Sequence, residues 1–100
     1  MTAMFVAVST YLRPLEEIDA VRDEHLEWIG AQYESGHLLV SGRQSTAVGG
    51  VIVGRAEARE LLAEDPFVRA GLAQYDVTEF EPTPAALAMP GLAAFVGDRS

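Results

Sequence analysis

Hydrophobic periodicity alternates along the chain between that of a strand and that of a helix, and the order of the changes leaves few folds open. β-branched and aromatic residues predict strands at residues 4–11, 37–43, 48–55 and 72–80, and helical periodicity predicts helices at residues 15–35 and 56–64. The chain is therefore predicted to be an α+β protein with the order βαββαβ. Such a chain folds as an antiparallel four-stranded sheet with both helices on one face.

The first predicted helix is amphipathic. Its acidic residues lie on one side, whereas His25 lies near the middle of the apolar side, one turn from Val21 and from Ile29. Ser35 and Gly36 follow as the expected end signal. His25 is therefore predicted to point toward the sheet, where a histidine is either a packed core residue or a site residue.

An Asp-Pro break ends the second predicted helix. Because a proline crowds the residue before it, Asp65 leaves the helical conformation, and Pro66 suits the first position of a new short turn. Asp65 is then the N-cap of that turn. Local rules explain this aspartate completely without any catalytic role.

Composition excludes several classes of function. Of the 100 residues 15 are acidic and 7 basic, and the formal charge of −8 repels nucleic acid and anionic lipid membranes. Without cysteine the chain has no disulfide or cysteine-ligated metal. We predict no metal and no cofactor, since neither ligand spacing nor a phosphate-binding loop is present. The short apolar start lacks the features of a signal or membrane segment, which predicts a cytoplasmic location.

One face of the predicted sheet is left without helices. Val6, Val8, Val51 and Val53 make that face apolar, which predicts that a second copy covers it in a homodimer. Residues 1–82 are predicted to form the folded domain, and residues 83–100 an apolar tail that packs on the surface of the domain or of the dimer.

Several of these segments together resemble the YCII (YciI-like) family. The resemblance covers about residues 4–80 and rests on the opening MFVAVSTY, on Arg22, His25 and Leu26 in the pattern R-x-x-H-L, on GHLLVSG, and on LLAEDPFVRAG. It implies a ferredoxin-like domain in a dimeric α+β barrel assembly, and a pocket in which His25 and Asp65 form an acid/base dyad. Where the family has a proline after GHLLVSG, this chain has Arg43, so the rim of the pocket differs in charge.

Four further residues are predicted to bind substrate. Arg22 lies on the same side of its helix as His25 and either holds an anionic group or pairs with a carboxylate at the helix edge. Ser41 lacks the sequence context of a nucleophile and would hydrogen-bond a substrate. Gly42 leaves room beside the backbone, and Phe67 either walls the pocket or fills the core.

A carboxylate bonded to one imidazole nitrogen fixes the tautomer and leaves the other nitrogen free to move a proton. The sequence thus predicts a small cofactor-free enzyme that acts on a small polar or aromatic molecule, either as a hydrolase that activates water or by removing an acidic substrate proton. The family resemblance implies that the second kind would be a dehydrochlorinase-like lyase. Two alternatives stay open. One is a non-catalytic module that binds a small ligand, and the other is a cofactor-independent oxygenase or isomerase of the dimeric α+β barrel kind.

Overall fold

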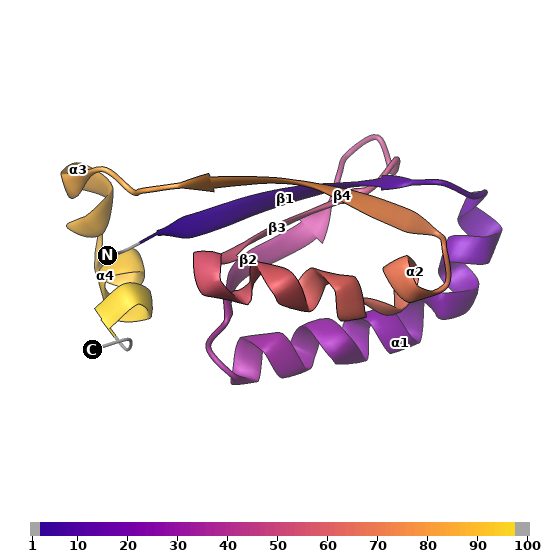
Figure 1. Ribbon diagram of the computed structural model, residues 1–100, viewed down its shortest axis with the longest axis horizontal. Helices are drawn as coiled ribbons and strands as arrows, with labels where there is room; N and C mark the ends of the chain where they lie inside the picture. The colour runs from indigo at the N-terminus through magenta and orange to yellow at the C-terminus, as the bar shows by residue number, and fades with distance from the viewer. Residues whose placement is uncertain (1–2, 98–100) are drawn as a thin grey trace.

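The computed structural model describes residues 3–97 and contains a four-stranded antiparallel sheet (Figure 1). The strands are β1 (Met4–Tyr11), β2 (Leu38–Arg43), β3 (Gly50–Arg55) and β4 (Ala73–Phe80), and they lie side by side in the order β2-β3-β1-β4. β1 is central and pairs with β3 on one side and with β4 on the other. This confirms the predicted βαββαβ fold, with some strands one or two residues shorter than predicted.

The helices that connect the strands lie together on one face of the sheet, as predicted (Figure 1). They are α1 (Leu15–Glu34), the 3-10 helix η1 (Ala56–Glu64) and α2 (Pro66–Arg69). α1 ends at Glu34 with Ser35 as its C-cap, and Gly36 follows with the positive φ of 77° that glycine adopts without steric cost. η1 differs from the expected α-helix, although its residues are good α-helix formers. None of the helices in residues 3–97 is long and apolar enough to cross a membrane.

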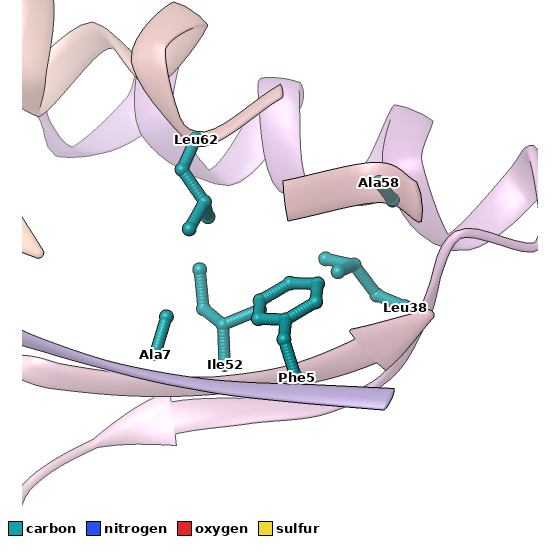
Figure 2. Close-up of a cluster of buried hydrophobic side chains, with 6 residues drawn as sticks. All are labelled: Phe5, Ala7, Leu38, Ile52, Ala58 and Leu62. Atoms are coloured by element: carbon teal, nitrogen blue, oxygen red, sulfur yellow. The ribbon is translucent and has the colours of Figure 1, made fainter. Parts of the chain in front are cut away.

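Two clusters of buried side chains join the helices to the sheet. In the first, Phe5, Ala7 and Ile52 rise from the sheet toward Ala58 and Leu62 of η1 (Figure 2). The second cluster joins α1, α2 and the start of β4, and its members are Ile18, Phe67, Leu72 and Ala73. Because the second cluster holds α1 against α2, it fixes the relative position of the two segments that carry His25 and Asp65.

The loop between β2 and β3 packs directly against β1. A Cβ atom at Gly49 would lie 1.7 Å from the carbonyl oxygen of Ser9, so only glycine fits there. The Gln44 side chain donates a hydrogen bond to the same carbonyl at 3.1 Å, and the Gly50 amide donates to the Ser9 hydroxyl at 2.7 Å. These contacts hold the hairpin close to the part of β1 that faces α1.

The C-terminal segment forms two short helices, α3 (Pro84–Leu87) and α4 (Pro90–Gly97), beyond one end of the sheet (Figure 1). Arg55 is buried and ties α4 to the domain. Its Nε donates to the Gly36 carbonyl at 2.7 Å, its Nη2 donates to the Phe95 carbonyl, and its guanidinium lies 4.4 Å from the centre of the Phe95 ring. The connecting helices leave the second face of the sheet open (Figure 1). Val8 and Val40 on that face are exposed, whereas Ala86 of α3 and Leu92 of α4 border a hollow with Met4 and Val53 at one end of it.

Candidate functional site

A cavity of about 180 Å³ lies between α1 and the sheet. Side chains from α1, α2 and all four strands line it, so that segments far apart in sequence meet there. Five of the six predicted site residues are on its wall: Arg22, His25, Ser41, Gly42 and Phe67. The sixth, Asp65, is completely buried behind His25. Tertiary folding therefore brings the predicted residues into one site.

His25 and Asp65 are hydrogen-bonded to each other, with Nδ1 of the imidazole 2.7 Å from Oδ1 of the carboxylate. The His25 side chain is 15% exposed, whereas that of Asp65 is fully buried. A carboxylate only accepts hydrogen bonds, so an ionised Asp65 places the proton of a neutral His25 on Nδ1. Nε2, which makes no hydrogen bond within residues 3–97, is then the nitrogen with a free lone pair.

Asp65 accepts two further hydrogen bonds besides that of His25. The Phe67 amide donates to Oδ1 at 2.9 Å, as expected of an N-cap, and the Tyr75 hydroxyl donates to Oδ2 at 2.5 Å. Oδ1 therefore both caps the helix and orients His25, and Oδ2 is bonded to Tyr75. Three donors surround a carboxylate that no water reaches, which is how a buried charge is accommodated.

Tyr75 is half-buried between Asp65 and the cavity. Burial and, after it, the negative charge of Asp65 raise the pKa of the Tyr75 hydroxyl above its ordinary value of 10.0. The hydroxyl therefore stays protonated at neutral pH and acts as a hydrogen-bond donor to the carboxylate. It is therefore a fixed hydrogen-bond donor that supports Asp65.

Phe67 is both a core residue and a wall of the cavity. It is 4% exposed, and its ring stacks on the imidazole of His25 with 4.1 Å between ring centres and 9° between planes. The Tyr11 ring meets it edge-on at 6.0 Å. The segment from Asp65 to Phe67 thus supplies the carboxylate, an amide that holds it, and a ring that limits rotation of the imidazole.

Two of the remaining predicted site residues, Ser41 and Arg22, and the rim residue Arg43 differ in whether they have hydrogen-bond partners. Ser41 is bonded to the Tyr33 hydroxyl at 2.6 Å, at the edge of the cavity. Arg43 donates to the Tyr11 hydroxyl at 3.3 Å and to Asp19 at 3.4 Å. Arg22 is half-buried and makes no hydrogen bond or ion pair with any residue of the described chain, so the expected alternative of a carboxylate partner at the helix edge is not realised.

Sequence reasoning missed the roles of Ser9, Tyr11 and Tyr75, all of which line the cavity. A signal for the first two was present, because alternation along β1 places them on the same face as Phe5 and Ala7. Polar residues that continue an apolar face indicate a cavity at that end of the strand. Tyr75 could be found only from strand pairing, because β4 pairs with β1 and the residue opposite Tyr75 on β1 is Ser9.

Within residues 3–97 no three histidine or carboxylate side chains lie close enough together to hold a metal ion. A buried carboxylate orients an imidazole whose free nitrogen is on the cavity side, beside two guanidinium groups and several hydroxyls. This arrangement can remove a proton from a small molecule and return it.

Comparison with known proteins agrees with the fold. The chain is similar to the 5-chloro-2-hydroxyhydroquinone dehydrochlorinase TftG from Burkholderia phenoliruptrix AC1100, solved in complex with 2,5-dihydroxybenzoquinone. The TM-score is 0.68 at 19% sequence identity, and the match covers 82% of this chain and 97% of the other. At this identity the likeness supports the ferredoxin-like α+β fold alone. No curated protein sequence matches the chain.

The resemblance that the sequence motifs indicated is confirmed by a match to the family profile. The YCII-related domain matches residues 4–81, which include every strand, α1, η1 and α2. The matched region also contains both members of the His25–Asp65 pair. The chain therefore belongs to the YCII-related domain family.

Proposed function

We propose that this protein is a small enzyme in which His25 moves a proton and Asp65 holds His25 in the required orientation. The observation that carries the proposal is the 2.7 Å bond between Nδ1 and the buried carboxylate, made by an imidazole that lines a cavity. Asp65 also supplies the negative charge that stabilises the imidazolium formed when Nε2 accepts a proton. A histidine that only filled the core would not need a cavity beside it.

The reaction class that fits these residues best is elimination. Loss of HCl from the keto tautomer of a chlorinated hydroquinone needs a base that takes a ring-hydroxyl proton. The O–H electron pair then forms the quinone carbonyl, the ring double bond shifts, and the carbon–chlorine pair leaves with chloride, so no nucleophile from the protein is needed. The similar structure is named a dehydrochlorinase, which agrees with this class. Hydrolysis by a water that His25 activates is the other reaction that the same pair supports.

The size of the cavity limits the substrate. Its volume of about 180 Å³ is close to the apolar cavity of about 150 Å³ that is known to hold one benzene molecule. A substrate of one substituted ring therefore fits. The stacked rings of Phe67 and His25 supply a flat surface beside it.

The proposed enzyme is a cytoplasmic homodimer that pairs through the helix-free face of the sheet. Val8 and Val40 on that face are 39% and 53% exposed, and burying them against a second copy would remove apolar surface from water. Size-exclusion chromatography with light scattering tests this directly. A clean monomer at micromolar concentration would contradict it.

The test of function is chloride release from 5-chloro-2-hydroxyhydroquinone by the purified protein. We expect turnover by the wild type, none by His25→Gln, and a loss of about 100-fold or more in Asp65→Asn, because the imidazolium loses its counter-charge. His37→Gln is the matched control, since His37 is bonded to Gln32 and is not on the cavity wall. Unchanged turnover in His25→Gln would reject the proposed base.

The binding-module alternative predicts a different result in the same samples. A wild-type protein that binds 2,5-dihydroxybenzoquinone but releases no chloride from the chlorinated compound would favour ligand binding without catalysis. Nitrogen-15 NMR of His25 gives a second, substrate-free readout. We expect the neutral ring to carry its proton on Nδ1, and a proton on Nε2 would remove the lone pair on which the proposed mechanism depends.

A further inference from the structure

Arg22 is placed beside His25 without a partner of its own. It precedes His25 by three residues on α1, so both side chains lie on the same side of the helix, and both line the cavity. Asp19 precedes Arg22 by three residues on the same helix, but its carboxylate is bonded to Arg43. Within residues 3–97 Arg22 makes no hydrogen bond or ion pair, although it is half-buried.

The charge on the cavity wall is opposite to that of the protein. The chain carries a formal charge of −8, but no aspartate or glutamate lines the cavity, and its charged lining residues are Arg22 and Arg43. The carboxylate of Asp65 lies behind His25 and already accepts three hydrogen bonds. A half-buried guanidinium that lacks a counter-charge in an otherwise acidic protein is an arrangement that an anion would complete.

We propose that the cavity binds a small organic anion, and that Arg22 recognises its anionic group. This rests on the proposed function for the role of His25, and it defines the class of substrate on which His25 acts. A guanidinium pairs with a carboxylate through two parallel hydrogen bonds, which fixes orientation as well as charge. The anionic group lies beside Arg22 and the proton to be removed lies one helical turn further along, beside Nε2 of His25.

The state of Arg43 indicates that one negative charge is preferred over two. Its guanidinium is bonded to the Tyr11 hydroxyl and to Asp19, and its Cζ lies 5.7 Å from the centre of the Tyr11 ring. Asp19, which is not among the lining residues, pairs with this second cation. Only Arg22 remains to compensate a ligand, so a ring with one anionic group, a phenolate or a carboxylate, fits the site better than a ring with two.

Trp28 gives a direct way to measure binding. It is the one tryptophan of the chain, and its ring centre lies 6.2 Å from that of His25. We expect benzoate to change the fluorescence of Trp28 saturably, and benzamide, which has nearly the same shape without the charge, to bind at least about tenfold more weakly. Phthalate, which carries two carboxylates, is expected to bind more weakly than benzoate.

Arg22→Gln should weaken benzoate binding about tenfold or more and leave the affinity for benzamide unchanged. Arg13→Gln is the matched control, because Arg13 is bonded to Glu17 and is not on the cavity wall. Equal affinities for benzoate and benzamide, equal loss in both arginine variants, or no binding of benzoate at millimolar concentration would each overturn the inference.

The same titration separates this inference from the proposed function. His25→Gln should abolish turnover but still bind benzoate, because the anionic group contacts Arg22. If His25→Gln keeps its turnover while Arg22→Gln loses benzoate, the proposed base is wrong and the anion site stands. If His25→Gln loses turnover and benzoate fails to bind the wild type, the base stands and the anion site is wrong.

Discussion

Replacing Asp65 by alanine removes the acceptor for three donors at once, which are Nδ1–H of His25, the Phe67 amide and the Tyr75 hydroxyl. Replacement by asparagine is the milder change. The amide oxygen can occupy the place of Oδ1 and keep two of the donors, and the Tyr75 hydroxyl can rotate to accept from the amide nitrogen. The two variants therefore separate loss of the hydrogen bonds from loss of the charge.

The expected cost of Asp65→Ala follows from the burial of each donor. The Phe67 amide is buried, so leaving it unpaired costs about 2 kcal/mol. His25 and Tyr75 line the cavity, where water can replace the carboxylate, and each costs about 1 kcal/mol. The alanine variant also avoids burying a charge, which offsets part of the total, so we expect a net loss of about 3 kcal/mol in the free energy of unfolding. Asparagine should cost about 1 kcal/mol.

Urea unfolding at one fixed protein concentration measures both costs, because assembly would make the midpoint depend on concentration. Asp19→Ala is the matched control. Asp19 is also bonded to a cavity residue, but its side chain is 58% exposed, so we expect a loss below about 0.5 kcal/mol. Equal losses in Asp65→Ala and Asp65→Asn, or a loss in Asp65→Ala as small as that of the control, would refute the assignment of three stabilising bonds to this carboxylate.

Three further changes test other contacts. The pKa of Tyr75 is higher in the folded protein than in the unfolded chain, where it is about 10.0. Above pH 10.0 the unfolded chain loses this proton first, so the free energy of unfolding, constant with respect to this group below pH 10.0, decreases as the pH rises. Tyr75→Phe should show a smaller decline in urea midpoints measured between about pH 8 and 11. Gly49→Ala should cost about 2–4 kcal/mol in the free energy of unfolding, since its Cβ would overlap the Ser9 carbonyl, and an unchanged midpoint would contradict that close approach. Phe95→Ala removes the cation–π contact of α4, worth about 1 kcal/mol, and should speed amide exchange in α4 but not in α1.

The local parts of the site were predictable from sequence. Helical periodicity placed His25 on the inner side of α1, and the Asp-Pro break predicted that Asp65 caps the following turn, which its bond to the Phe67 amide confirms. Both inferences depend on interactions within a few residues, for which the rules of backbone conformation suffice. The pairing of His25 with Asp65 came from family resemblance, because nothing local relates residues 40 positions apart.

The sequence by itself therefore determined the order of the elements, the βαββαβ fold and the direction in which His25 points. Only the tertiary structure decided that Tyr75 occupies the second oxygen of Asp65 and that Arg22 is left without a carboxylate partner. The physical reason is that the first kind of information lies in periodicity and steric preference along the chain. The second depends on which strands become neighbours and which of many carboxylates each arginine reaches, and these contacts exist only after the sheet and α1 have packed together.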